Sequence, residues 1–246
     1  PWLIENEMVY LIDGRQLIDS GFLGTDWTHA PAGLPRSLTF APLTAALWWI
    51  SSDVLSVALL ARLIVWGVFL LALRRLAQTL SIAPLVTLIG LLAYVSTGQS
   101  IACGEWILGG AEQKVLAYSF FLLALTEMMQ HRPKKAGLFI GLAALSHILV
   151  GGYGFGGLLL AGLTLVAKKH WRLRQLAEFA GIASLLVLPA LILAAMQEGL
   201  LHSNPIGSGT VDAGRMSVEF RNPHHLDPAF FLDWWEVMIA VCMLAA

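Results

Sequence analysis

Long apolar runs separated by short polar or basic segments dominate the middle of the chain. A helix that crosses a bilayer needs about 20 predominantly apolar residues, so runs of this length indicate membrane spans. The pattern predicts spanning helices at about residues 54–73, 80–96, 113–130, 136–150, 153–167 and 175–196. We therefore expect an all-α fold, a polytopic transmembrane helical bundle.

The stretch 136–167 predicts a helical hairpin rather than one long helix. A single helix of this length would extend about 48 Å, against a hydrocarbon core of about 30 Å. It would also place basic clusters on both sides of the membrane. Because glycine clusters usually mark turns, we expect the turn at residues 151–154, Gly-Gly-Tyr-Gly. The wider glycine-rich run matches no phosphate-binding loop, and it favours tight helix packing.

Three polar segments surround the predicted spans, at residues 1–53, 97–113 and 197–233. The first contains an apolar stretch, 38–50, that is too short to span and ends in two tryptophans, which is typical of a helix lying at the membrane interface. Long loops such as 197–233 are commonly functional or disordered. The last apolar run, 234–246, is also too short to span. We therefore expect residues 1–246 to form one transmembrane domain that is a portion of a longer protein.

Composition supports a membrane protein and excludes other classes. The chain is 57% hydrophobic and 13% charged, with a mean hydropathy of +0.73. Soluble domains carry about 25% charged residues, and disordered chains are far less apolar. A net charge of -1 gives no indication of nucleic-acid binding. Cys103 and Cys242 form neither a disulfide framework nor a metal-binding pattern.

The few charges are segregated along the chain. Segments 74–81, 131–135 and 168–175 hold nine of the fifteen Lys and Arg residues, whereas 1–53, 97–113 and 197–236 hold fourteen of the sixteen Asp and Glu residues. The positive-inside rule places the basic segments in the cytoplasm. We therefore expect an integral protein of the bacterial inner membrane, with its long acidic loops facing the periplasm or the outside.

Two of the long loops contain candidate catalytic or binding residues. Asp26 lies beside Trp27 in the first loop and is a candidate general base or metal ligand; the alternative is a solvated loop residue that caps a turn. Arg221, His224 and His225 form the densest polar cluster. An arginine fork suits phosphate, and histidines bind metal, phosphate or protons. No further Cys or His has structural-zinc spacing, so an interfacial polar loop is the alternative.

Glu105, Glu112 and Lys114 lie at the external mouth of the predicted span 113–130. Ionisable groups at a helix end in membrane territory are candidates for function. Lys114 could bind a lipid phosphate, or it could simply form a local ion pair with either acid.

Three more ionisable residues lie within or beside apolar segments. His147 is near the external end of an apolar helix and is either a ligand or a hydrogen-bonded packing residue. Arg36 precedes the predicted interfacial helix, at the level where a lipid phosphate would lie. Arg62 is in mid-span and must face protein or water. For both arginines, a salt bridge within the protein is the alternative to substrate contact.

Taken together, these features resemble the GT-C superfamily of polytopic membrane glycosyltransferases. The resemblance rests on an acid in the long first external loop (Asp26), an interfacial helix after it, and a Glu-x-Lys motif followed by Tyr118. The fourth feature is the loop Arg221-x-Pro-His224-His225. Many members of the superfamily have paired acids in the first loop, whereas Asp26 is followed by tryptophan.

The resemblance implies sugar transfer on the external face of the bilayer from a polyprenyl-phosphate-linked sugar. Asp26 would act as the base or in metal binding, and Lys114, Arg36 and Arg221 would bind phosphate. A divalent cation is left open as a cofactor. The alternatives are a transporter or flippase whose polar residues line a path across the bilayer, and a non-catalytic membrane scaffold.

Overall fold

The computed structural model describes residues 5–22, 35–96 and 108–203, with side chains described for 7–22, 35–96 and 108–196. All regular secondary structure in these ranges is helical, which confirms the predicted all-α fold. The helices are α1 (Glu5–Ile18), α2 (Phe40–Ile50), α3 (Val54–Thr79), α4 (Pro84–Ser96), α5 (Gln113–Met129), α6 (Pro133–Ser146), α7 (Ile148–Ala167) and α8 (Leu173–Ser203).

The contacts divide the chain into two units. The first comprises residues 1–87 and 110–203 and contains every helix except the larger part of α4. The second comprises residues 88–109 and 204–246, of which the structure describes 88–96 and 108–109. The fold and the candidate site described below belong to the first unit.

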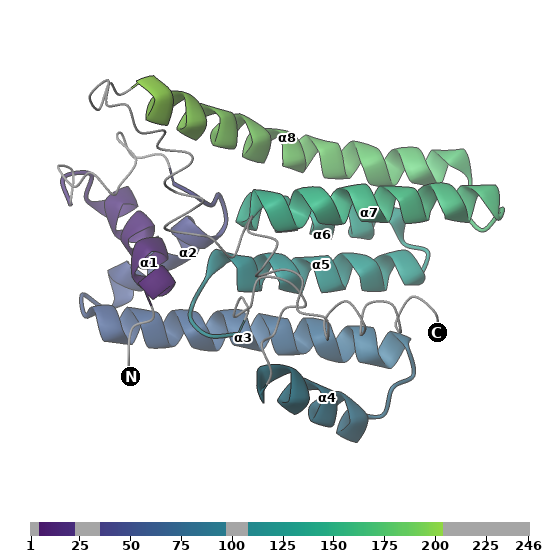
Figure 1. Ribbon diagram of the computed structural model, residues 1–246, viewed down its shortest axis with the longest axis horizontal. Coiled ribbons are helices and arrows are strands. Elements are labelled where there is room, and N and C mark those ends of the chain that lie inside the picture. Colours follow the sequence, from purple (N-terminus) through teal and green to yellow (C-terminus); the bar gives the residue numbers. More distant parts are fainter. Residues whose placement is uncertain (1–4, 23–34, 97–107, 204–246) are drawn as a thin grey trace, which may run out of the picture. The chain divides into compact units, whose positions relative to one another are not determined.

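Helices α3, α5, α6, α7 and α8 of the first unit run side by side as a bundle (Figure 1). The Gln130 side chain after α5 donates a hydrogen bond to the Thr79 hydroxyl at the end of α3 (2.8 Å). The carboxyl-terminal ends of α3 and α5 therefore lie together, and the two helices are parallel. Short turns make α6 antiparallel to α5 and α8 antiparallel to α7. The core between them is built from apolar side chains, including Ala124, Ile140, Leu158 and Phe179.

Three helical segments are long and apolar enough to cross a membrane: Val54–Thr79, Ile148–Ala167 and Leu173–Met196. Their outward faces keep large apolar side chains exposed, such as Leu63, Leu160 and Leu185. A large exposed apolar surface of this kind needs lipid rather than water around it. These features identify an integral membrane protein. The other predicted spans, 80–96, 113–130 and 136–150, correspond to the shorter helices α4, α5 and α6, of 13, 17 and 14 residues.

The structure confirms that 136–167 forms two helices, but the predicted turn at 151–154 is wrong. The break falls at His147, whose extended backbone ends α6 and whose Nδ1 accepts a hydrogen bond from the Val150 N–H at the start of α7 (3.4 Å). The glycines lie inside α7. A Cβ added at Gly151 would come within 2.1 Å of the Ala144 backbone nitrogen on α6. Gly151 therefore serves the close approach of two antiparallel helices, as predicted for the wider glycine run.

Helices α1 and α2 pack together at the end of the bundle where α3 begins (Figure 1). They cross so closely at Gly14 that a Cβ there would lie 2.1 Å from the Thr44 hydroxyl oxygen. The Trp48 indole N–H donates to the Leu11 carbonyl (2.9 Å), and the Arg15 guanidinium lies 5.4 Å from the Trp48 ring centroid. The expected helix at 38–50 is therefore present as α2, and its location at a membrane interface stays a prediction. The apolar pattern of the sequence predicted no helix at Glu5–Ile18, where the structure has α1.

Basic residues gather at the opposite end of the bundle. The Trp171 indole before α8 donates to Nδ1 of His131 before α6 (3.0 Å), and Gln130 joins the same end to α3. The described parts of the three basic segments, 74–81, 131–135 and 168–175, therefore share one end, as the alternation of spans requires. Which side of the membrane that end faces stays a prediction.

We predict that Gly151→Ala destabilises the protein, whereas Gly152→Ala does not. A methyl group at Gly151 would collide with the α6 backbone, but no atom lies within 4 Å of a Cβ added at Gly152. Overpacking of this kind costs about 1–3 kcal/mol. Thermal unfolding of the two variants in one detergent compares them directly, and equal melting temperatures would contradict the proposed helix contact.

Candidate functional site

Buried polar side chains concentrate at the end of the bundle formed by α1, α2, the start of α5 and the end of α6. We call this region the polar end, and its members are Glu7, Asp13, Ser37, Thr44, Glu112, Gln113, Lys114 and Ser146. Burying polar and charged groups costs free energy unless they pair with one another. The polar end is therefore where the chemistry of the described residues is concentrated.

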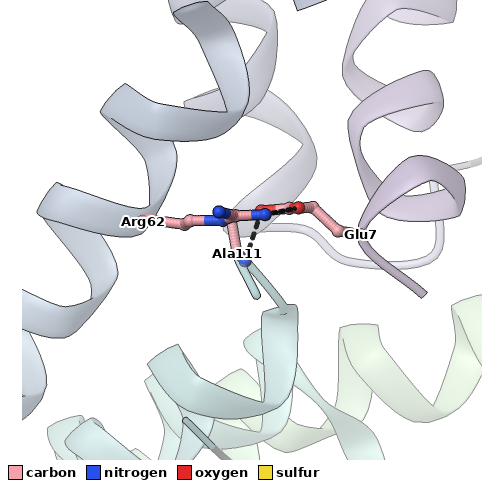
Figure 2. Close-up of polar contacts among 3 residues, drawn as sticks. All are labelled: Glu7, Arg62 and Ala111. Atoms are coloured by element: carbon pink, nitrogen blue, oxygen red, sulfur yellow. Dashed lines mark hydrogen bonds and ion pairs between the residues drawn. The ribbon is translucent and has the colours of Figure 1, made fainter. Parts of the chain in front are cut away.

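Glu7 is the central residue of the polar end. Its side chain is fully buried and forms an ion pair with Arg62, in which the carboxylate accepts hydrogen bonds from both Nε (2.7 Å) and a terminal guanidinium nitrogen. The backbone N–H of Ala111 donates to the same carboxylate (2.8 Å). Figure 2 shows these groups converging from α1, from α3 and from the segment that leads into α5. One carboxylate thus joins three parts of the chain that are far apart in the sequence.

The position of Arg62 along α3 makes this ion pair significant. Arg62 lies about 18 Å along the helix axis from Arg74, at about 1.5 Å per residue, so it is well inside the apolar part of α3. Leu59 and Leu63, on the adjacent turn and the next position of α3, are 49% and 59% exposed. An arginine at this depth needs a partner, and Glu7 supplies it. The structure therefore confirms the alternative of a salt bridge within the protein for Arg62.

The segment before α5 packs directly on Glu7. A Cβ added at Gly110 would lie 3.3 Å from the Glu7 Cβ, so a side chain here would press on the buried carboxylate. Glu112 is the N-cap residue of α5, and Gln113 and Lys114 form its first turn. Glu7 therefore contacts the segment that leads into the first turn of α5, which carries Lys114.

Lys114 and Glu112 form a second buried ion pair. The Lys114 ammonium lies 3.1 Å from Oε2 of Glu112, and the two side chains are only 10% and 4% exposed. The predicted pairing of Lys114 with a nearby acid is confirmed for Glu112. The pair lies in the segment that Ala111 joins to Glu7. Phosphate contact by Lys114 stays a prediction.

The polar end continues to the break between α6 and α7. Oδ2 of Asp13 accepts a hydrogen bond from the Arg36 backbone N–H (3.2 Å). The residues that follow Arg36 in the sequence bind the end of α6. The Leu38 N–H donates to the Leu145 carbonyl (2.9 Å), and the Thr39 and Ser146 hydroxyls lie 2.7 Å apart. The backbone next to Arg36 therefore lies against the backbone next to His147.

The structure describes four of the predicted site residues. Glu112 and Lys114 are paired, Arg36 is half-buried, and His147 caps α7 through Nδ1, which is a structural role for that ring nitrogen. All four are at the polar end. The other predicted residues lie outside the described ranges, namely Asp26, Glu105, Arg221, His224 and His225. Their convergence with Lys114 stays a prediction.

Glu7 was missed by the sequence analysis. The available signal was Arg62, because an arginine in mid-span requires an acid from another segment. Nothing in the sequence spacing distinguishes Glu7 from the other acids of residues 1–53.

Among the described residues, no group of three or more His, Cys, Asp or Glu side chains could hold a metal ion. Comparison with protein-family models, curated proteins and solved structures gives no match to this chain.

We predict that Glu7→Gln destabilises the protein by about 3–5 kcal/mol, because it leaves the Arg62 guanidinium without its buried counter-charge. The double variant Glu7→Gln/Arg62→Gln should lose less than the sum of the two single variants. Reversible unfolding in detergent of all four forms gives this coupling energy. Additive losses would show that the ion pair is not coupled.

The matched control is Glu178→Gln at the other end of the bundle. Glu178 also pairs with an arginine, but Arg174 is 86% exposed. An exposed pair contributes about 0–1 kcal/mol, so this variant should unfold almost like the original protein.

Proposed function

We propose that the protein is a membrane glycosyltransferase of GT-C type that transfers a sugar from a polyprenyl-phosphate donor on the external face of the membrane. The observation that carries the proposal is the buried Glu112–Lys114 pair at the start of α5, in a segment that Ala111 bonds to the Glu7–Arg62 pair. A lipid-linked phosphate presents its charge at the membrane surface. Charged groups retained at the end of a span, despite their desolvation cost, are suited to recognising such a group.

The chemistry requires two kinds of group. A base takes the proton from the acceptor hydroxyl, whose oxygen attacks the sugar C1 while the bond from C1 to the phosphate oxygen breaks. Cations stabilise the polyprenyl phosphate that leaves. We assign the base to Asp26 and phosphate binding to Lys114, with Arg36 and Arg221 in support. His224, His225, Glu105 and a divalent cation remain candidates for the acceptor side of this site.

The distribution of buried polar side chains supports an enzyme over a transporter. A transport path needs polar groups through the depth of the bilayer. Within the apolar depth of the described helices, Arg62 is neutralised by its ion pair with Glu7. Ser119 and Thr126 are buried there too, and each hydroxyl donates to a carbonyl of its own helix (2.7 and 2.8 Å). Hydroxyls bonded in this way do not line a path.

Transfer activity tests the role of Lys114. In the full-length protein, Lys114→Gln should lower transfer from a labelled polyprenyl-phosphate sugar by about 100- to 1,000-fold, the scale for losing one group that stabilises developing charge. Lys114→Arg should recover part of the activity, because it keeps the charge. Unchanged transfer by a folded Lys114→Gln variant would contradict the assignment, and Arg75→Gln serves as the control for an exposed cation.

Asp26→Asn tests the proposed base in the same assay. Loss of a general base lowers rates by about 100- to 10,000-fold, and the melting temperature should not change, since Asp26 is assigned a chemical role. Full activity of this variant would remove Asp26 from the mechanism.

A further inference from the structure

The end of the bundle opposite the proposed site carries a dense group of exposed cations. We call it the basic surface. It is formed by the α5–α6 turn and by the α7–α8 turn with the start of α8, and its members are Arg132, Lys134, Lys135, Lys168, Lys169, Arg172 and Arg174, all exposed. None of these residues has a part in the proposed sugar transfer.

The two turns are held together as one surface. The Trp171 indole N–H donates to Nδ1 of His131 (3.0 Å), and the His131 and His170 ring centroids are 6.4 Å apart. Trp171 is only 2% exposed and packs against Phe179 in the core. The cations of both turns therefore have a fixed mutual arrangement.

The basic surface keeps a strong positive charge after its ion pairs are counted. Glu127 pairs with Arg132 (3.5 Å), and Glu178 pairs with Arg174 (3.1 Å) and with Lys134 at 3.9 Å. Seven cations and two acids leave a net charge of +5. Within the part of the chain that the structure describes, Lys135, Lys168 and Lys169 make no ion pair. Helices α6 and α8 also begin at these turns without an acidic residue in the first turn, so their dipoles add to the positive potential.

Apolar side chains lie directly beside these cations. Leu163 on α7 is 47% exposed, about 8 Å along the helix from Lys168, and Leu173 at the start of α8 is 70% exposed. A phospholipid offers the same combination, with acyl chains next to a phosphate. Because lipid surrounds the apolar faces of α7 and α8, the cations beside these leucines lie at the level of the headgroups, where an anionic phospholipid supplies both partners.

We propose that the basic surface binds the phosphate groups of anionic phospholipids in the adjacent leaflet. The lysines and arginines supply the counter-charge, and the neighbouring leucines contact the acyl chains. Basic clusters at the ends of membrane helices attract anionic headgroups in this way, with an effect that falls as salt screens the charges. This inference is independent of the proposed glycosyltransferase activity.

The test uses the full-length protein in a zwitterionic detergent, titrated with phosphatidylglycerol, cardiolipin or phosphatidylcholine. Thermal unfolding and native mass spectrometry report the lipids bound. We expect the two anionic lipids to raise the melting temperature and to remain bound, and phosphatidylcholine to do neither. The effect of the anionic lipids should shrink as salt is raised.

The triple variant Lys135→Gln/Lys168→Gln/Lys169→Gln should weaken anionic-lipid binding by about 100-fold, since each cation near an anionic surface contributes about fivefold. The matched variant with arginine at the same three positions keeps the charge and should bind like the original protein. Because all three lysines are exposed, both variants should fold.

Two outcomes would overturn the proposal. One is equal stabilisation by phosphatidylcholine and by the anionic lipids. The other is undiminished anionic-lipid binding by the triple glutamine variant, which would place the lipids elsewhere. Loss of sugar transfer without loss of lipid binding, or the reverse, would separate this proposal from the proposed function.

Discussion

The arrangement of the polar end depends on the need to neutralise Arg62 inside an apolar helix. Its guanidinium is held by the fully buried carboxylate of Glu7, which also accepts the Ala111 N–H. Leaving either charge alone at this depth would cost several kcal/mol. The pairing therefore holds α1 and the start of α5 at a defined height on α3, and Lys114 takes its position from that arrangement.

Close helix contacts provide the second constraint. At Gly14 and at Gly151, the absence of a side chain lets neighbouring helices approach to distances that no Cβ would allow. The first contact sets α1 against α2, and the second sets α6 against α7. Packing through small residues suits helices in lipid, where the hydrophobic effect does not press helices together. The contact at Gly14 thus adds to the polar pairing on α1, and the contact at Gly151 acts between α6 and α7.

The lengths of the apolar runs and the basic segments between them were enough to predict the all-helical fold, the positions of α3, α5 and α8, and the split of residues 136–167. It failed for α1, because the buried positions of that helix include Glu7, Asp13 and Gly14, which do not read as an apolar face. The turn between α6 and α7 was misplaced because a glycine can either mark a turn or allow close helix packing. Gly151 serves packing, and His147 caps α7. The Glu7–Arg62 pair joins residues 55 positions apart, a distance over which spacing carries no signal.

The sequence separations at the polar end also set an order of assembly. Glu7 meets Ala111 across 104 positions, and Ser37 donates to the Leu145 carbonyl across 108 positions (3.2 Å). At a synthesis rate of about 5–20 residues per second, roughly 5–20 seconds separate the appearance of these partners. During that interval, the carboxylate of Glu7 in α1 lacks its hydrogen bond from Ala111. The polar end is therefore completed only after α6 has been made, and premature termination before residue 145 would leave it open.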